Sequence, residues 1–335
     1  MDFLKNYEGI ALHAPNAHEC SKHLLVFFVT GNPGLVHYYN EYLSTVSNYR
    51  DRITSKNSNT ALHIYSCSLA GYETTGSTNP AFVAKHGQGP YDVDQERYFI
   101  DQAIVHAGQD LRSQFGMPKM EDMRVVIIGH SLGTYLTLEN LRRSRARRSP
   151  WKIVSAILLC PTIMDLAGSP TGKKLALIGS FRYTAPVVAF IAKALCSILS
   201  SAWLLWLIQK ITGQPPDAAH TTMRFLQSPT GVLQALTLAR HELRDISVDK
   251  WDDDIWGVVA QDTSSTESRV STHTNPKTKL FLYFAEQDHW IADETRDQII
   301  AARASSGKKG EENKPLMEID KTGMPHDFCI RHSRP

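Results

Sequence analysis

Short apolar runs that alternate with longer helical segments constrain the fold of this chain more than any other feature of its sequence. The six runs lie at residues 23–31, 61–72, 123–129, 153–160, 279–285 and, more weakly, 316–320. Segments with helical spacing lie between them, at 95–114, 134–143 and 291–304. Because the runs are apolar on both faces, they are typical of strands buried in a parallel sheet. The alternation predicts an α/β protein, with a mostly parallel central sheet and helices on both faces.

The bulk composition excludes several classes of protein. Hydrophobic residues make up 42% of the 335 residues, enough for a substantial core, and a net charge of +2 gives little attraction to nucleic acid. The five cysteines are scattered and form no Cys-x-x-Cys pair, so neither a disulfide framework nor a zinc site is indicated. The first twenty residues lack the apolar core of a signal peptide, so we expect a protein that is made in the cytosol and faces it.

The pentapeptide Gly129-His130-Ser131-Leu132-Gly133 has the pattern G-x-S-x-G and stands between a predicted strand and a helical segment. This is the context of a nucleophile elbow, in which a strained turn presents a serine hydroxyl at the edge of the sheet. Glycines flank such a serine because larger side chains would clash with the neighbouring strand and helix. We therefore predict Ser131 as a nucleophile; the alternative is an idle serine in a tight turn.

A nucleophilic serine needs a base, and the base needs an acid that orients it. In this architecture the chain order is serine, then the acid, then histidine. Asp288 follows the fifth apolar run and is the candidate acid, with Glu286 and Asp293 as alternatives. His326 follows the last predicted strand and is the candidate base, with His332 as its competitor.

The tetrahedral intermediate of ester cleavage also needs N–H donors for its oxyanion. We expect one donor to be the backbone amide of Leu132, directly after the nucleophile. The other is expected in the loop "TGNPG" after the first core strand, where Asn32 is the candidate. This chemistry requires no metal and no organic cofactor, and we expect none.

An unusually apolar block, "VVAFIAKALCSILSSAWLLWL", occupies residues 187–207 and carries a single charge. The block is long enough to cross a hydrocarbon core of ~30 Å. A single crossing is excluded by topology, because Ser131 precedes the block whereas Asp288 and His326 follow it. The block must therefore re-enter the membrane, lie along an interface or pack on its own domain.

Three arrangements of this block remain open: a hairpin with 174–185 as its first arm, a flat interfacial helix, or a plain lid over the pocket. Trp203 and Trp206 near its end favour an interfacial position. We expect the hydrolase core to comprise residues 1–164 and 257–335, the latter with a flexible polar insertion at 262–276. The expected helical cap comprises 165–256, and its segment 174–208 is the part that we expect to associate with lipid.

Five stretches together resemble the lipid droplet-associated hydrolase family of the α/β-hydrolase superfamily. They are "VTGNPGLVHYYNEYL", "VVIIGHSLGTYL", "LLCPTIMDLAGSPTG", "LYFAEQDHW" and "GMPHDF". The resemblance implies an α/β-hydrolase fold with Ser131 as nucleophile, Asp288 as acid and His326 as base. It also implies a serine ester hydrolase that acts on neutral lipids of the sterol ester or acylglycerol type.

The resemblance places the protein on the cytosolic face of the lipid droplet monolayer, with the endoplasmic reticulum membrane as the alternative. The rival hypothesis is a droplet-surface protein that keeps the hydrolase fold with only vestigial turnover. A third reading is a soluble esterase for small molecules, in which 187–207 is a plain lid.

Overall fold

The computed structural model describes residues 3–53, 59–75, 78–116, 123–147, 151–179, 183–257, 278–307 and 313–331. Its centre is a seven-stranded sheet in the order β1-β3-β2-β4-β5-β6-β7. The strands are β1 (Gly9–Leu12), β2 (Lys22–Val29), β3 (Thr60–Cys67), β4 (Arg124–His130), β5 (Lys152–Leu159), β6 (Lys279–Phe284) and β7 (Leu316–Ile319). All neighbours pair in parallel except β1 with β3. Strands β2 to β7 coincide with the six apolar runs, which confirms the predicted mostly parallel sheet.

Strand β1 is the one strand of the described sheet that the apolar pattern did not predict. It has only four residues, and none of them is fully buried. It lies at the edge of the sheet, antiparallel to β3, where one side of the strand has no neighbour. A short edge strand needs no apolar run, so hydrophobic patterning does not reveal it.

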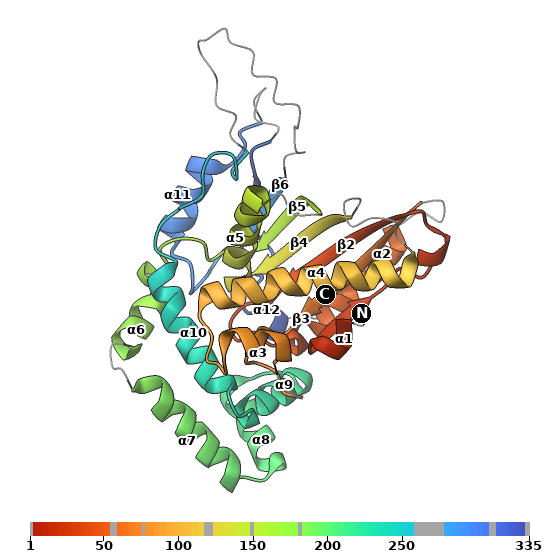
Figure 1. Ribbon diagram of the computed structural model, residues 1–335. Coiled ribbons are helices and arrows are strands. Elements are labelled where there is room, and N and C mark those ends of the chain that lie inside the picture. The colour runs from red at the N-terminus through yellow and green to blue at the C-terminus, as the bar shows by residue number, and fades with distance from the viewer. Residues whose placement is uncertain are drawn as a thin grey trace.

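Helices cover both faces of the sheet (Figure 1). The longer ones are α2 (Asn40–Ile53), α4 (Val93–Phe115), α5 (Leu132–Arg147) and α11 (Asp293–Arg303), and short ones are α1 (Phe3–Asn6), α3 (Pro80–His86) and α12 (Phe328–Arg331). Single 3-10 turns occupy η1 (Ala17–Glu19), η2 (Val36–Tyr39) and η4 (Leu166–Gly168). Helix α4 begins with a capping box between Asp92 and Gln95, which satisfies amides at its N-terminus. These helices confirm the three predicted helical segments.

Five further helices lie between β5 and β6 and gather beyond one end of the sheet (Figure 1). They are α6 (Pro170–Gly179), α7 (Thr184–Ile198), α8 (Ser201–Thr212), α9 (Pro216–Gln227) and α10 (Gly231–Asp245). We call this group the inserted helices. The polar segment 262–276, predicted to be a flexible insertion, lies outside the described residues.

The apolar block 187–207 is not one helix. The chain leaves the helical conformation at Leu199, and the Ser200 hydroxyl caps α8 by accepting from the amide of Trp203 at 3.4 Å. The block therefore contributes to two helices, and 174–185 contributes the end of α6 and the start of α7. Among the described residues, no helix combines the length and apolar character that a membrane crossing requires.

Candidate active site

Ser131 lies on a sharp turn between β4 and α5 and has a left-handed backbone conformation, with φ of 52°. Such a conformation in a residue with a side chain costs on the order of 1–3 kcal/mol and persists only where the surroundings impose it. A Cβ added at Gly129 would lie 2.4 Å from the carbonyl oxygen of Gly133, and one at Gly133 would lie 2.3 Å from that of Val29. The flanking glycines thus allow the close approach of strand and helix that the turn requires.

The structure brings Ser131, His326 and Asp288 together at the carboxyl edge of the sheet, where ligands bind in open α/β folds. His326 Nε2 lies 2.9 Å from Ser131 Oγ, and His326 Nδ1 lies 2.7 Å from Asp288 Oδ2. The side chains of His326 and Asp288 are 9% and 4% exposed. Ser131 follows β4, Asp288 follows β6 and His326 follows β7, so three parallel strands converge to position the three side chains.

The alternative acids lie elsewhere. Asp293 begins α11, is mostly exposed and pairs with Arg296 at 2.9 Å. Glu286 is exposed, and its backbone oxygen accepts from the same guanidinium. The competing base His332 lies outside the described residues. Among the described candidates, only Asp288 contacts the imidazole of His326.

The loop that carries His326 is held by Asp320, at the end of β7. Its carboxylate accepts from the hydroxyl of Tyr283 at 2.7 Å and from the amides of Thr322 and Met324 at 3.0 and 2.7 Å. Burial opposes ionisation of Asp320, but these hydrogen bonds outweigh it and lower its pKa to about 2. The charged carboxylate therefore fixes the turn directly before His326.

His130 adds a second support for that loop, one that the sequence pattern did not reveal. Its Nε2 donates to the backbone oxygen of His326 at 2.8 Å, and its Nδ1 accepts from the hydroxyl of Tyr39 at 2.8 Å. The same hydroxyl accepts from the amide of Gly31 at 3.0 Å. Burial and the neighbouring His326 lower the pKa of His130 to about 3, so its ring is neutral and bridges the loops after β2 and β7.

The predicted oxyanion residues both lie beside Ser131. Leu132 begins α5, and the loop containing Asn32 packs on the serine, since a Cβ at Gly31 would lie 3.0 Å from Ser131 Cβ. Neither the Leu132 nor the Asn32 backbone amide donates a hydrogen bond to another described residue. Both amides are therefore without a partner in the described chain, and their role as oxyanion donors stays a prediction.

The side chain of Asn32 connects this loop to α10. Its Oδ1 accepts from the hydroxyl of Tyr72 at 2.6 Å, and its Nδ2 donates to Glu242 Oε1 at 2.6 Å and to the Ala235 carbonyl at 3.1 Å. Burial raises the pKa of Glu242 by more than the hydrogen bond from Asn32 lowers it, and the resulting pKa is about 7. A buried carboxyl group with a raised pKa is thus part of the site, and no local sequence pattern marks it.

A small pocket opens beside the serine. Its polar and aromatic lining consists of Asn32, Ser131, Thr162, Glu242 and Trp290, and the remaining lining is leucine and alanine. The free volume is about 20 Å³, which is room for about one water molecule. Helix α10 contributes part of the wall through Ala239, Glu242 and Leu243.

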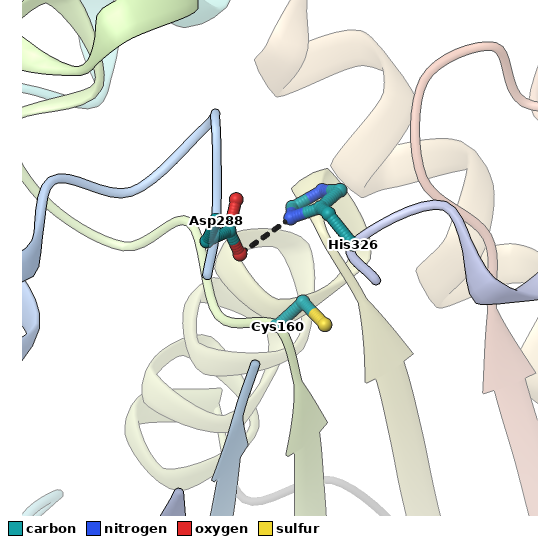
Figure 2. Close-up of side chains that lie close together, drawn as sticks. All are labelled: Cys160, Asp288 and His326. Atoms are coloured by element: carbon teal, nitrogen blue, oxygen red, sulfur yellow. Dashed lines mark hydrogen bonds and ion pairs between the residues drawn. The ribbon is translucent and has the colours of Figure 1, made fainter. Parts of the chain in front are cut away.

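Cys160 lies against the Asp288–His326 pair, as Figure 2 shows. One ligand atom from each of the three lies within 4.8 Å of the others, which is the kind of cluster that can hold a metal ion. Burial raises the pKa of the Cys160 thiol well above its ordinary value, and the charge of Asp288 raises it further. A protonated thiol is a poor ligand, and Asp288 and His326 already bind each other, so this donor set fits a metal poorly.

Comparison with known proteins agrees with this architecture. A relative described as lipid droplet-associated hydrolase from Mus musculus is 25% identical over 232 residues, which are 69% of this chain and 65% of that protein, a little under two thirds of its length. A relative of the same description from Rattus norvegicus is 26% identical over 314 residues, which are 93% of this chain and 82% of that protein.

Solved structures show the same fold. The peroxisomal α/β-hydrolase of Saccharomyces cerevisiae superimposes with a TM-score of 0.53 at 10% identity, over 98% of this chain and 85% of that one. The fold is therefore that of the α/β hydrolases. The model of the family described as lipid-droplet associated hydrolase matches residues 22–329. With nearly the whole sequence matched, the chain belongs to the lipid-droplet associated hydrolase family.

Proposed function

We propose that this protein is a serine ester hydrolase that cleaves neutral lipid esters, of the sterol ester or acylglycerol type, at the surface of lipid droplets. The observation that carries the proposal is the hydrogen-bonded series Ser131–His326–Asp288, in which Ser131 lies on a strained turn. A hydroxyl, an imidazole and a carboxylate in this order are the parts of an acyl-transfer site. The family membership supports the same reaction class.

In the proposed reaction, His326 Nε2 takes the proton of Ser131 as Oγ attacks the ester carbon. Asp288 keeps Nδ1 protonated and stabilises the imidazolium that forms. The amides of Asn32 and Leu132 donate to the oxyanion. The protonated His326 then gives its proton to the departing alcohol, and a water molecule that the neutral His326 activates releases the acid from the acyl-enzyme.

The surface of the inserted helices supports a lipid environment. Most exposed large apolar side chains of the described chain lie between residues 177 and 211, and Phe190 and Ile198 are 73% and 80% exposed. Trp203 and Trp206 add aromatic rings to the same surface. A patch of this kind marks an interaction with protein or lipid, and the droplet association in the relatives' names favours lipid. We place this contact on the cytosolic face of the droplet as part of the proposal.

The test is labelling of the purified protein with a fluorophosphonate probe, together with hydrolysis of a panel of esters on an oil emulsion and in buffer. Ser131→Ala should abolish labelling and lower ester hydrolysis by at least about a thousandfold, because the nucleophile is lost. Ser197→Ala, on an exposed part of α7, should keep both the probe labelling and the ester hydrolysis of the wild-type protein. Persistent labelling of the Ser131→Ala protein would point to a different nucleophile.

A second candidate function follows from the same apolar surface and from the small volume of the pocket. The protein could act chiefly on the droplet surface itself, with little turnover. Cells that carry only the Ser131→Ala protein distinguish the two functions. Unchanged droplet number and size relative to wild type would favour the surface role, whereas a changed phenotype would favour the hydrolase.

A further inference from the structure

Two polar side chains that the proposed reaction does not use line the pocket beside Ser131. Glu242 comes from α10, among the inserted helices, and Thr162 comes from the segment that follows β5. A pocket for a wholly apolar ester needs neither group, since burying polar atoms against hydrocarbon is unfavourable. Their presence therefore raises the question of which ligand these two side chains contact.

The carboxyl group of Glu242 is only partly engaged. Its Oε1 accepts from Asn32 at 2.6 Å, while its Oε2 forms no hydrogen bond within the described chain. Glu242 is itself buried, so a substrate that fills the pocket with hydrocarbon would seal a free carboxyl oxygen away from water. Such a group is stabilised only by a polar partner.

Thr162 offers a second free group. The residue is 2% exposed, and its hydroxyl has no hydrogen-bond partner among the described residues. Buried hydroxyls are nearly always hydrogen-bonded, so the Thr162 hydroxyl is available to a molecule that enters the pocket. Thr30 also has a buried hydroxyl without such a partner, but it does not line the pocket and provides a natural control.

The charge of the lining restricts the ligand further. Among the described residues that line the pocket there is no lysine or arginine, and Glu242 is the one carboxyl group. A phosphate or carboxylate on the substrate would face this acid without a balancing cation. A neutral hydroxyl, by contrast, donates to a carboxyl oxygen and accepts from a threonine hydroxyl at the same time.

We propose that the ester cleaved at Ser131 keeps a free hydroxyl group within a few bonds of the scissile carbonyl, and that Glu242 and Thr162 bind this hydroxyl. A mono- or diacylglycerol has such a group on its alcohol part, and a hydroxy-fatty acid ester has it on its acyl part. A sterol ester and a triacylglycerol have none. This inference rests on the proposed function and narrows its substrates to esters that keep a hydroxyl group, which excludes the sterol esters named there.

The experiment compares 2-hydroxyethyl oleate with propyl oleate, two esters of similar size that differ in the hydroxyl, on the same emulsion. The wild-type protein should prefer the hydroxyl ester by about tenfold or more in kcat/KM, as sites that bind a substrate hydroxyl do. Thr162→Val and Glu242→Leu should bring the ratio close to one. Thr30→Val, the matched control, should keep the wild-type ratio.

A ratio within one variant cancels any effect of that variant on the position of Asn32 or on folding. A second pair, ethyl 3-hydroxypalmitate and ethyl palmitate, tests the acyl side, and a preference there would support the subsite and place the hydroxyl on the acyl chain. Wild-type ratios near one for both pairs would overturn the inference while leaving the hydrolase intact. If the wild-type protein cleaved no ester and resisted the fluorophosphonate, the proposed function itself would fail.

Discussion

Helices α7 and α10 belong to the same group of inserted helices and both have 15 residues, yet they relate to the rest of the molecule in opposite ways. The strongly apolar α7 buries none of its residues and exposes a row of valine, isoleucine, leucine and phenylalanine side chains. The more polar α10 buries Gly231, Gln234, Leu238 and Glu242 along one stripe. In this group, apolar character does not predict burial. Whether a helix of this group is buried depends on whether the hydrolase core packs against it.

The polar residues of α10 are buried because the hydrolase core provides partners for them. Gln234 Oε1 accepts from the amide of Tyr91 at 2.6 Å, and its Nε2 donates to the Tyr91 carbonyl at 3.0 Å and to Glu96 at 3.1 Å. Eight residues further along, Glu242 accepts from Asn32. Helix α10 is thereby joined to the core at two places, whereas the main packing partners of α7 are α9 and α10.

The sharpest test of this contrast is Gln234→Ala. The change removes the buried partner of the Tyr91 amide, the Tyr91 carbonyl and Glu96 Oε1, so we expect the free energy of unfolding to fall by about 2–4 kcal/mol. Urea unfolding measures this free energy. Ile191→Ala, near the middle of α7, should change the same quantity by less than about 1 kcal/mol, because this side chain is already half exposed. Equal effects of the two variants would remove the distinction between the helices.

A smaller effect is expected for Glu242→Gln, and it should depend on pH. Because the folded pKa of about 7 lies above the ordinary value of 4.5, the native state binds the proton more tightly between these values. The wild-type free energy of unfolding therefore falls as pH rises through this window, by on the order of 2 kcal/mol. Glutamine keeps an acceptor for Asn32 and does not titrate, so the variant should gain stability relative to wild type between pH 5 and 7.5. If the difference in unfolding free energy between Glu242→Gln and wild type stayed constant over that range, the raised pKa of Glu242 would be contradicted.

The smallest effect on stability is expected for Phe190→Ser on α7. This side chain is mostly exposed, so the free energy of unfolding should change by less than about 0.5 kcal/mol. Binding to an oil emulsion should nevertheless weaken by about tenfold, since a buried phenylalanine contributes about 1.5–3 kcal/mol. Flotation with the emulsion measures the binding, and Lys193→Ser on the same helix should leave it unchanged. A clear loss of stability with unchanged flotation would show that α7 packs on protein instead.

Much of the fold was predictable because it depends on local patterns. The apolar runs identified β2 to β7, and the strand–serine–helix context placed Ser131 at a turn whose φ of 52° the structure shows. The structure also places Asp288 and His326 in contact, although their catalytic roles remain predictions. The break at Ser200 could have been anticipated from the serines within the block, because serine is a common helix cap.

The remaining features arise from contacts between distant parts of the chain. The hydrogen bond between Asn32 and Glu242 joins residues 210 positions apart, and the one between His130 and the His326 carbonyl joins residues 196 apart. No local spacing marks either pair. The residues of each pair meet only after the strands have assembled into the sheet and brought the loops at its carboxyl edge into contact. Hydrophobic periodicity and turn signals therefore could not predict these hydrogen bonds.

The bridging ring of His130 has a consequence for protein engineering. The pattern G-x-S-x-G leaves the residue before the serine unspecified, but here that residue needs an acceptor on one side for Tyr39 and a donor on the opposite side for the backbone of residue 326. A flat five-membered ring meets both demands at once without carrying charge. A library that randomised this position would therefore yield few active clones, and grafting this elbow into another scaffold would require the tyrosine to be transferred with it.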